Sequence, residues 1–462
     1  LKSLIATGLI PKQIDVYALN QYFSYGYITA PYTLLKNVFK LEGAQYLHYD
    51  IESRKEIRGK YYQFFPLINY DIGFDEAVNS LWNLILKAVG ERVKDSVGLF
   101  LSGGLDSSTV ALALRTLMPQ INISAYSIRF EDEELNEPFV RLVADNLSLD
   151  LDEVLLTEET FIKNFEQLPF FFDDLIGEAS ASVSTLILLQ ESSRKNKVIF
   201  TGEGGDEIFW GYKWVLAKQK NRFIPKIPRN FRRLSLSFLE RLSNNLKPDV
   251  LLNMERALRY SLVGDLEEFL DLFKIIDYSW ICYMLCKELR KNCKDSHKLL
   301  NETLLNTVNK MNVDDLTKRY ILVYNFLTKR FGIRRVESIA TAYGINVRAP
   351  LLDSRLVDFM YSLPPHFKQV DGKTKIILRK MLKKYSNFPE VFVEQRKRGF
   401  AVEAWLKRHV LDYAYDSLEV NLDCVDGILD KKRVSEFISR KPDVSEVFIL
   451  LLFVLWCKLF MR

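Results

Sequence analysis

The chain has 462 residues, 48% hydrophobic and 13% aromatic, which is enough apolar material for a large buried core and excludes an intrinsically disordered protein. The 64 basic and 59 acidic side chains leave a net charge of +5, too small an excess for this length to indicate a nucleic-acid-binding protein.

Residues 1 to about 70 form a short opening segment, after which apolar side chains recur at helical spacing from Asp75 to about Val93. Strand-like and helical stretches then alternate. We predict strands at 97–101, 123–128, 151–156 and 198–201 and helices at 106–117, 137–146 and 185–193. Strands joined by helix-length connections imply an α/β fold with a doubly wound parallel sheet, and the pattern after Tyr212 implies a large helical C-terminal part.

The stretch VGLFLSGGLDSS, from Val97 to Ser108, has the pattern of a strand, a glycine turn and the start of a helix. Consecutive glycines let the backbone approach a ligand, and the amides at a helix start attract anions, so the turn suits phosphate. The lysine of the familiar phosphate loop is absent, and Asp106 follows the glycines instead. A carboxylate beside polyphosphate requires a divalent cation between them. We therefore predict a site where Mg²⁺-bound ATP is cleaved between its α and β phosphates; an ordinary tight connection is the alternative.

A second glycine-rich stretch, TGEGGDEIFWGY from Thr201 to Tyr212, follows the last predicted strand. Its glycines allow a tight path around Glu203, and Asp206 and Glu207 add two more acids at the edge of the sheet. Three carboxylates within five residues repel one another unless a positive charge lies among them, and we assign that charge to Mg²⁺. Ligands bind beyond the carboxyl ends of parallel strands, where both stretches fall. An acidic surface turn is the alternative.

These stretches resemble those of a known family. SGGLDSS is similar to the pyrophosphate-binding loop of the PP-loop ATP pyrophosphatase superfamily, and TGEGGDEIFWGY resembles the matching segment of asparagine synthetases. RAPLLD at Arg348–Asp353, then Leu378–Arg379 and RKRGF at Arg396–Phe400, follow in the order of that family. The likeness covers nearly the whole chain. It implies a PP-loop fold and a synthetase domain at 71–462 with a helical subregion at about 214–330.

The resemblance implies ATP and Mg²⁺ as cofactors and assigns roles to residues. Asp106 and Asp206 would hold the Mg²⁺ that bridges to pyrophosphate, and Glu203 would lie beside the reacting carbonyl as a general base. Lys397 would stabilise charge in the second half-reaction, although an arginine on either side leaves open which cation points inward. Asp106, Glu203 and Lys397 are thus the expected catalytic residues. The implied ATP contacts are Leu101 and Ile128 at the adenine, Thr201 and Gly202 near the ribose, and Ser102, Gly103, Gly104, Asp106, Ser107 and Ser108 at the pyrophosphate.

The implied reaction is ATP-dependent formation of an amide bond. A substrate carboxylate is activated as acyl-AMP with release of pyrophosphate, and ammonia or an amine then displaces AMP. Aspartate with ammonia is the leading pair, and Glu203 supports it because β-lactam synthetases carry Tyr at that position. The runner-up is an intramolecular or peptide amide synthetase of natural-product biosynthesis, like the β-lactam synthetases or lasso-peptide cyclases. Asn346 favours the runner-up, because asparagine synthetases usually carry Glu there.

Two further classes remain to be weighed. PP-loop enzymes that modify tRNA share the first motif, but the second motif and the small net charge argue against them. A non-catalytic nucleotide-binding scaffold is the other class, and the presence of Asp106, Glu203, Asp206 and Lys397 argues against it. Ser102 is not expected to act as a nucleophile, because none of the four histidines lies near it in sequence or in a motif.

Leu19 to Asp50 resembles the last part of the N-terminal glutaminase domain of asparagine synthetases, so residues 1–70 are expected to be the tail or remnant of such a domain. Those enzymes use an N-terminal cysteine to free ammonia from glutamine, and the first cysteine here is Cys282, which also favours the runner-up. The expected partners are a small-molecule or peptide carboxylate substrate, an ammonia or amine donor, and a separate glutaminase domain or chain. A homodimer is left open, and neither nucleic acid nor a membrane is expected.

The five cysteines are odd in number and lack a repeated spacing, which argues against a disulfide framework and for the cytosol. Cys282 and Cys286 lie in the run YSWICYMLCKELR, where their four-residue spacing predicts two thiols on one buried helix face. A metal cluster with Cys293 and His297 is the disfavoured alternative.

No signal peptide is visible in Leu1–Leu9, and the apolar stretch Val447–Cys457 is too short to span a bilayer. A cytoplasmic protein with a core helix near its C-terminus is expected. The basic stretch Lys218–Arg241 is expected to be a solvated loop and helix face rather than a surface for an anionic partner.

Overall fold

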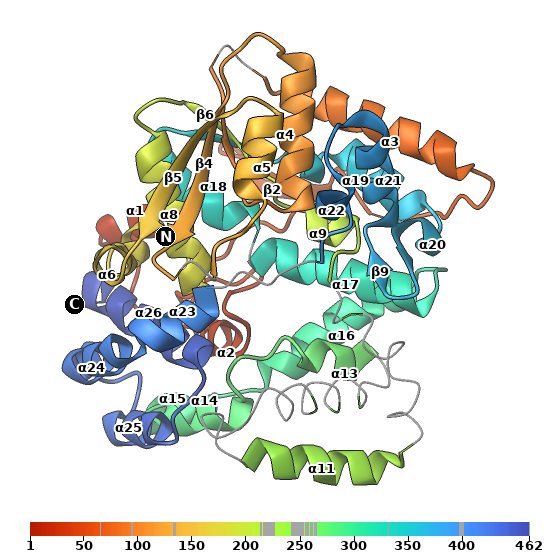
Figure 1. Ribbon diagram of the computed structural model, residues 1–462. Coiled ribbons are helices and arrows are strands. Elements are labelled where there is room, and N and C mark those ends of the chain that lie inside the picture. The colour runs from red at the N-terminus through yellow and green to blue at the C-terminus, as the bar shows by residue number, and fades with distance from the viewer. Residues whose placement is uncertain are drawn as a thin grey trace.

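The computed structural model describes residues 1–462 apart from 65, 94–95, 133–134, 213–214, 216–226, 242–253, 255–257, 259–261, 263–265, 331, 397–401 and 462. At its centre lies a five-stranded parallel sheet in the order β5-β4-β3-β6-β7 (Figure 1). The strands are β3 Gly98–Phe100, β4 Ser124–Phe130, β5 Asp150–Leu156, β6 Val198–Phe200 and β7 Asn346–Arg348. Because β3 and β6 are neighbours, the two glycine-rich stretches that follow them emerge side by side at the carboxyl edge.

Alternate side chains of the strands face different helices, which confirms the doubly wound fold. In β6, Val198 and Phe200 belong to an apolar cluster with α3 and α4, whereas Ile199 belongs to a cluster with α8 and α26. These helices are α3 Phe74–Gly90, α4 Leu105–Leu117, α8 Ala179–Ser192 and α26 Val444–Phe460. Successive strand side chains point to opposite faces, so strands of mainly apolar residues need helices on both sides.

The connections between strands are helical, as the sequence predicts, with shifts at some boundaries. Besides α4 and α8 they include α5 Val140–Asn146, α6 Glu158–Phe165 and α7 Leu168–Phe171, and α9 Gly205–Ile208 follows β6. β4 continues to Phe130 instead of ending at Ile128. α8 begins at Ala179 instead of Thr185, because its first turn is rich in Ala and Ser and lacks the apolar spacing that marks a helix.

The rest of the chain is largely helical, as predicted after Tyr212. Before β7 come α11 Arg229–Arg241, α13 Leu266–Asp271, α14 Tyr278–Met284, α15 Lys287–Arg290, α16 Ser296–Asn309, α17 Asp315–Arg330 and α18 Ile333–Ala342. After β7 come η5 Pro350–Leu352, α19 Ser354–Ser362, α20 Pro365–Lys368, β8 Gln369–Val370, β9 Lys373–Thr374, α21 Ile376–Tyr385, α22 Glu390–Val393, α23 Val402–His409, α24 Leu411–Asn421, η6 Leu422–Val425 and α25 Lys431–Ser439. Of the basic stretch, residues 218–226 lie outside the described residues, and α11 exposes Phe231, Leu234 and Phe238.

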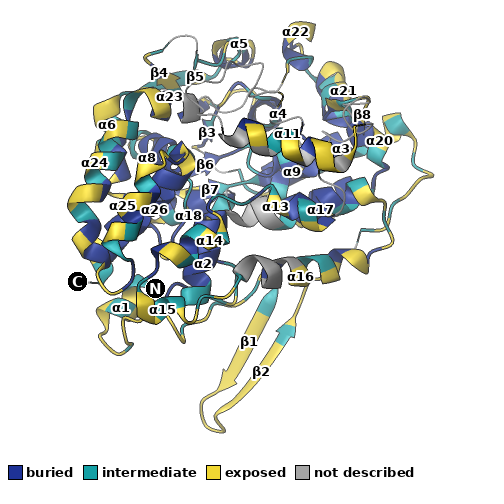
Figure 2. Ribbon diagram, turned by 90° about the horizontal axis from the view of Figure 1, so that it is seen from below, coloured by how far each residue is buried: buried dark blue, intermediate teal, exposed yellow. Residues whose placement is uncertain are grey.

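The N-terminal segment divides into a packed part and a projecting hairpin. It begins with α1 Lys2–Ala6, and α2 Val16–Tyr25 is mostly buried, with the Tyr22 hydroxyl donating to the Ile449 carbonyl of α26 at 2.9 Å. β1 Gln45–Asp50 and β2 Lys55–Lys60 pair in antiparallel fashion and extend away from the body with nearly every residue exposed (Figure 2).

α26 confirms the predicted core helix near the C-terminus. Asp443 and Glu446 form a capping box at its start, and every residue from Val447 to Cys457 is buried. Among the described residues, no helix combines the length and the apolar character needed to cross a bilayer.

Two expectations about the cysteines are wrong. Cys282 and Cys293 form a disulfide, although the odd count argued against one. α14 ends at Met284 because Leu285 is extended, so Cys286 lies outside the helix and is only half-buried. The four-residue spacing therefore does not place two thiols on one buried face, and the cysteine count no longer argues for a reducing compartment.

Candidate active site

The first motif joins β3 to α4 through Ser102, Gly103 and Gly104. Gly103 has a φ of +71°, a conformation that favours glycine, and a Cβ there would lie 3.0 Å from the backbone nitrogen of Val140. Gly104 stands at the N-cap of α4, where no side chain of the described residues accepts a hydrogen bond from the first amide groups of the helix. Such amides carry partial positive charge and favour an anion. The loop therefore has the shape and the charge for phosphate.

Serine side chains hold this loop in shape. The hydroxyls of Ser102 and Ser107 lie 3.1 Å apart, and the Ser107 hydroxyl accepts from the Ser102 N–H at 3.2 Å. The Ser108 hydroxyl is buried and finds no hydrogen-bond partner among the described residues. The structure thus brings Ser102 and Ser107 together, while the contacts of all three serines with pyrophosphate stay predictions.

The second motif packs directly against the first. A Cβ on Gly202 would lie 2.6 Å from the backbone nitrogen of Ser107, and one on Gly205 would lie 2.3 Å from Cγ of Asp106. Any larger side chain at either position would collide with the start of α4. The glycines that the sequence places around Glu203 therefore let the two loops touch.

Asp106 and Asp206 meet at the ammonium group of Lys375. Nζ of Lys375 lies 2.7 Å from Oδ1 of Asp206 and also contacts Oδ2 of Asp106. Lys375 stands between β9 and α21, has a φ of +59° and is 5% exposed. Burial acts to lower the pKa of this lysine, but the two carboxylates outweigh burial and raise the pKa, so the ammonium stays charged.

Lys375 is absent from the sequence-based predictions, which stop at the neighbouring Leu378–Arg379. It is 269 positions away from Asp106, and a left-handed backbone is uncommon for a lysine, so neither the contact nor the conformation is visible in the sequence. The nearest signal in the sequence is Leu378–Arg379, three positions further along, which follows the order of the family.

Basic side chains of the protein itself neutralise the acidic side chains for which the sequence analysis predicted a Mg²⁺ ion. Lys375 lies between the two aspartates, and Arg335 pairs with Glu203. The sequence analysis assigned the compensating charge to Mg²⁺, and in the structure Lys375 and Arg335 supply positive charge beside these carboxylates. Two carboxylates in the first turns of α4 and α9 still match the way proteins hold Mg²⁺, with phosphate oxygens as further ligands. Since no described group of three His, Cys, Asp or Glu side chains forms a metal site, Mg²⁺ at Asp106 and Asp206 stays a prediction.

Glu203 follows β6 and pairs with a buried arginine that the sequence analysis did not identify. Nη2 of Arg335 lies 2.9 Å from Oε1 of Glu203, and Nη1 of the same guanidinium lies 2.5 Å from Oε2 of Glu178. Burial raises the pKa of Glu203, Arg335 opposes the rise, and Asp206 adds to it. A carboxylate with a raised pKa at the edge of the sheet has the properties of a general base.

Glu207, the third acid of the second motif, is buried beside this edge. It is 7% exposed and accepts a hydrogen bond from the Tyr212 hydroxyl at 2.9 Å. Burial raises the pKa of Glu207 to about 7. Glu207 therefore lies near Asp206 and Glu203, whose charges also raise its pKa, but its own carboxyl group is buried against Tyr212.

The predicted adenine and ribose contacts, Leu101, Ile128 and Thr201, surround the same edge. Leu101 donates its N–H to the Tyr126 carbonyl at 2.9 Å, where the pairing of β3 with β4 ends. Ile128 lies beyond that point and pairs on its other side with Val154 of β5. Within the described sheet, Ile128 thus has no strand partner on the side of β3, and the contacts of adenine with Leu101 and Ile128 stay predictions.

Lys397 lies outside the described residues, but the segment before it is fixed. The guanidinium of Arg379 donates to the carbonyls of Val393 and Gln395, the latter at 3.1 Å. Gln395 in turn donates from Nε2 to the Gly103 carbonyl at 3.2 Å. The segment that leads to Lys397 therefore ends beside the first motif.

Asn346 stands at the far end of its strand from this edge. It pairs with Val198 at the amino end of β7 and is exposed, whereas Arg348 stands at the carboxyl end. The exchange of Glu for Asn at this position therefore lends no support to the runner-up reaction. Leu352 packs against Gly204, where a Cβ would lie 2.2 Å from its Cδ2, so the third motif supports the second.

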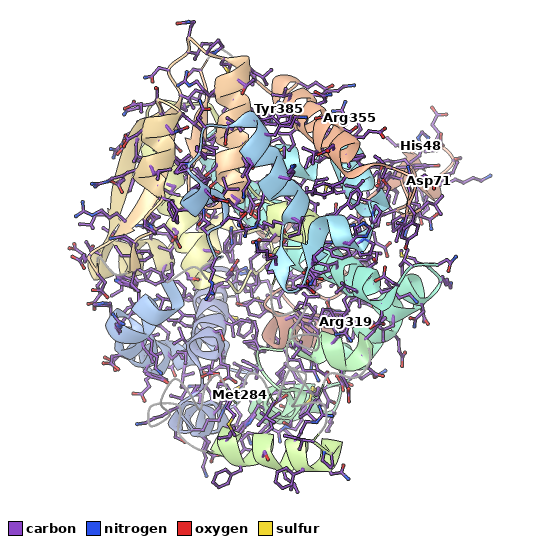
Figure 3. The ribbon with its side chains drawn as sticks, turned by 45° about the vertical axis from the view of Figure 1, so that its right-hand side comes forward. His48, Asp71, Met284, Arg319, Arg355 and Tyr385 are labelled. Carbon is purple, nitrogen blue, oxygen red and sulfur yellow. A yellow bond between two sulfur atoms is a disulfide. The ribbon has the colours of Figure 1, made fainter. Side chains whose placement is uncertain are left out.

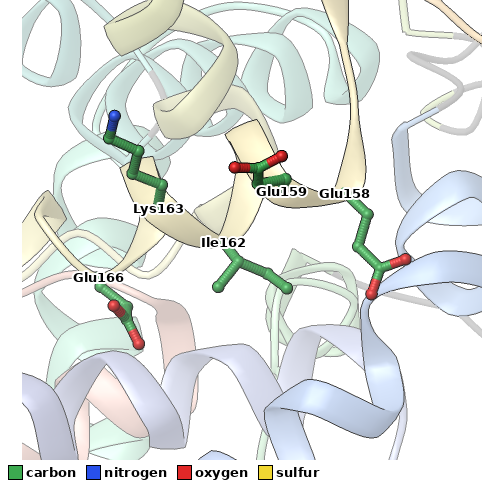
Figure 4. Close-up of a pocket in the computed structure, with 5 residues that line it drawn as sticks. All are labelled: Glu158, Glu159, Ile162, Lys163 and Glu166. Atoms are coloured by element: carbon green, nitrogen blue, oxygen red, sulfur yellow. The ribbon is translucent and has the colours of Figure 1, made fainter.

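The histidines give Ser102 no partner among the described contacts. His48 lies on the projecting hairpin (Figure 3), and His409 contacts Asp132 at 3.3 Å. A surface hollow along α6 contains no residue of either motif (Figure 4). Its lining residues are Glu158, Glu159, Ile162, Lys163 and Glu166.

A parallel sheet with a glycine turn, an uncapped helix start and two converging aspartates at its carboxyl edge defines a nucleotide-binding α/β protein of the PP-loop type. The sequence profile of the asparagine synthase family matches residues 81–458. The chain belongs to this family.

Related proteins extend beyond this chain. It is 32% identical over 58% of its length to a Methanocaldococcus jannaschii protein provisionally named a glutamine-hydrolyzing asparagine synthetase, and the match spans 52% of that protein. It is 23% identical over 96% of its length to asparagine synthetase (glutamine-hydrolyzing) 1 of Bacillus subtilis, and the match spans 69% of it. The chain thus spans about half the length of the first relative. Among solved structures, an NH3-dependent NAD synthetase from Campylobacter jejuni has 16% identity and a TM-score of 0.23, with 41% of this chain and 95% of that chain covered, a likeness too small to bear on function.

Proposed function

We propose that the protein is an ATP-dependent ligase that forms amide bonds in the manner of asparagine synthetases. The meeting of Asp106, Asp206 and Lys375 beside the uncapped start of α4 carries this proposal. The arrangement combines amide donors for phosphate oxygens with two carboxylates, in the first turns of α4 and α9, that suit Mg²⁺. Glu203, in the turn that leads from β6 into α9, adds a base.

In the first half-reaction, an oxygen of the substrate carboxylate attacks the α-phosphorus of ATP, the bond to the β-phosphate breaks, and acyl-AMP forms. The backbone amides of the first motif and the ammonium of Lys375 bind the departing pyrophosphate and stabilise its charge. Asp106 and Asp206 would hold Mg²⁺, which when bound neutralises phosphate charge.

In the second half-reaction, nitrogen attacks the acyl carbon and AMP leaves. An amine that arrives as an ammonium ion must first lose a proton, and Glu203 accepts it. Lys397 is proposed to stabilise the negative charge that develops on the acyl oxygen.

Aspartate and ammonia remain the leading substrates. A second candidate is that the amine belongs to the substrate itself. We keep it because one relative is named as an amidase and not as an asparagine synthetase. This relative is the amidase ChyE of Penicillium rubens, which is 24% identical over 67% of this chain.

We further propose that the region around the β1–β2 hairpin is the end of a glutaminase-like domain, in the same or a separate chain. Tyr49 and Ile57 of the hairpin are 53% and 61% exposed, and a lone two-stranded hairpin is only marginally stable. The greater length of the relatives fits such a domain. Ile14 to Leu35 contributes buried residues to the same core as α26 and is assigned to the synthetase part with residues 71–462.

Phosphorus NMR of the products tests the proposed reaction. With ATP, Mg²⁺, aspartate and ammonium, we expect AMP and pyrophosphate in equal amounts. Formation of ADP and phosphate would contradict the proposal. Turnover with an amine-bearing peptide carboxylate but not with aspartate would reject only the leading pair.

The variant Asp106→Ala tests the site. We expect AMP formation to fall by about a hundredfold or more, because the phosphates lose a carboxylate-held cation and Lys375 loses one of its two anchors. Thermal unfolding should change little, because the side chain is partly exposed. Asp145→Ala, at an exposed position on α5, is the matched control and should keep the wild-type rate. Wild-type AMP formation by Asp106→Ala would contradict the role of Asp106.

A further inference from the structure

Glu178, Arg335 and Glu203 form a linked row of charges from three separate segments. Glu178 precedes α8, Arg335 lies near the start of α18, and Glu203 follows β6. Nη1 of the guanidinium lies 2.5 Å from Oε2 of Glu178, and Nη2 lies 2.9 Å from Oε1 of Glu203. The arginine side chain is 8% exposed, whereas each glutamate side chain is 27% exposed. A buried cation therefore connects two acids that both reach solvent.

The backbone beside Glu178 is tightly held. The Gly177 N–H donates to the Gly26 carbonyl at 2.6 Å, and Ile176 pairs with Tyr27. A Cβ on Gly177 would lie 2.7 Å from the side chain of Ile449 in α26, so the segment is pressed against the core. Glu178 is therefore a fixed anchor for the guanidinium.

Arg335 is also held from its own helix. Val336 and Ile339 of α18 are buried in the core, which fixes the orientation of the helix. Nε of Arg335 is buried and lacks a hydrogen-bond partner among the described residues. The guanidinium is thus held at its two terminal nitrogens, and a planar group held in this way fixes the direction of its partners.

We propose that Arg335 is a positioning residue for nitrogen transfer, holding the Glu203 carboxylate in place for the incoming ammonium or amine while Glu178 anchors Arg335. This role rests on the proposed function. Because Arg335 holds Oε1 of Glu203, Oε2 is the oxygen that takes the proton from the ammonium group. The neutral nitrogen then bonds to the acyl carbon, and the carbon–oxygen bond to AMP breaks.

The charges around Glu203 agree with this role. Burial, Asp206 and Asp106 all raise the pKa of Glu203, and Arg335 is the cation that opposes them. Without the arginine the pKa rises further, so a larger fraction of Glu203 is protonated at neutral pH and cannot accept a proton. The pH profile of amide formation should then move to higher pH.

Measuring the two half-reactions separately tests the proposal. Exchange of labelled pyrophosphate into ATP with aspartate reports on acyl-AMP formation, and asparagine formation with ammonium reports on the whole sequence. For Arg335→Gln we expect exchange within about twofold of wild type and a loss of amide formation of about tenfold or more. Arg335→Lys should restore part of the amide formation. Glu178→Gln, which alters only the half-exposed anchor, should show a smaller loss of the same kind.

Two controls separate positioning from general damage. Arg334→Gln, at the exposed neighbouring position of α18, should match wild type in both assays. Hydroxylamine, a nitrogen nucleophile that is mostly unprotonated at neutral pH, should reduce the defect of Arg335→Gln because little proton removal is needed.

Wild-type amide formation by both Arg335→Gln and Glu178→Gln would overturn the proposal. So would an equal loss of exchange and amide formation in Glu178→Gln protein whose thermal unfolding matches wild type. Absence of exchange in the wild-type protein would instead overturn the proposed function with aspartate, and this role for Arg335 with it.

Discussion

Among single residues, the site depends most on Asp106 and on the two contacts of its carboxylate. Its carboxylate is bounded by Gly205 of the second motif on one side and by the Lys375 ammonium on another. The first contact sets the distance between the two loops, and the second compensates the charge that Asp106 shares with Asp206. A side chain at Gly205 and a neutral residue at Lys375 should therefore disturb different properties of the same carboxylate.

Gly205→Ala tests the close approach of the two loops. Its Cβ would lie 2.3 Å from Cγ of Asp106, so Asp106 must turn or α9 must shift. We expect pyrophosphate exchange to fall about tenfold or more and stability to fall by about 1–3 kcal/mol, the usual cost of overpacking. Gly73→Ala, whose Cβ would have its nearest neighbour at 4.0 Å, is the control and should leave exchange unchanged. Wild-type exchange by Gly205→Ala would show that the contact is not needed.

Among the secondary-structure elements, a buried lysine of α20 caps the C-terminal end of α19. Nζ of Lys368 donates to the carbonyls of Met360 and Leu363 at 2.8 and 2.9 Å and lies 4.3 Å from the ring centre of Trp210. Trp210 in turn stacks on Tyr320 of α17, with ring centres 4.3 Å apart. The amino group of Lys368 therefore links the end of one helix to the aromatic layer behind the second motif.

Lys368 should make the free energy of unfolding depend on pH. Burial lowers its pKa from 10.5 to about 7, so the folded protein favours the neutral amine. The stability from this group is fully present above the unfolded pKa and is lost as the pH falls toward the folded pKa. Urea unfolding should therefore show wild-type stability rising by about 2 kcal/mol between pH 7 and pH 9 through this group.

Lys368→Met should remove that rise, since Met fills a similar volume without a titrating group. Lys407→Met, at an exposed position, is the control and should keep the wild-type dependence. If the free energy of unfolding of Lys368→Met depends on pH as it does in the wild-type protein, then Lys368 keeps an ordinary pKa.

Elements could be predicted from the sequence where their signals lie in consecutive residues. The short apolar runs of β3 and β6 and the continuous apolar stretch of α26 show their type directly. α14 could not be bounded in this way, because the extended residue Leu285 ends the helix within an apolar run that looks helical. Local patterns therefore predicted four of the five strands, β3 to β6, and their covering helices, but not the edge strand β7 or where each helix stops.

At the scale of the whole molecule, the site depends on contacts between distant parts of the chain. Arg335 and Glu203 are 132 positions apart, and Lys375 and Asp106 are 269 apart. The motifs place the acids and the glycine turns, because these lie beside each other in sequence, but a single sequence does not show which distant lysine or arginine compensates them. The acidic member of each ion pair was therefore predictable from the sequence, and the basic member was not.

The N-terminal and C-terminal parts of the chain are also held together by a contact between residues far apart in sequence. The hydrogen bond between the hydroxyl of Tyr22 and the carbonyl of Ile449 spans 427 positions. The segment around Gly26 then holds Gly177, next to Glu178, so the N-terminal part supports the candidate active site from outside the motifs. The β1–β2 hairpin, by contrast, extends away from this arrangement (Figure 2).

The most direct test of the nucleotide site is a crystal structure with Mg²⁺ and an ATP analogue whose α–β bridge cannot be cleaved. We predict that the triphosphate lies between residues 102–108 and 202–206, that Asp106 and Asp206 share the metal ion, and that Lys375 has moved from between them onto a phosphate oxygen. A triphosphate bound elsewhere, or one bound with the Lys375 bridge unchanged, would contradict the proposed site.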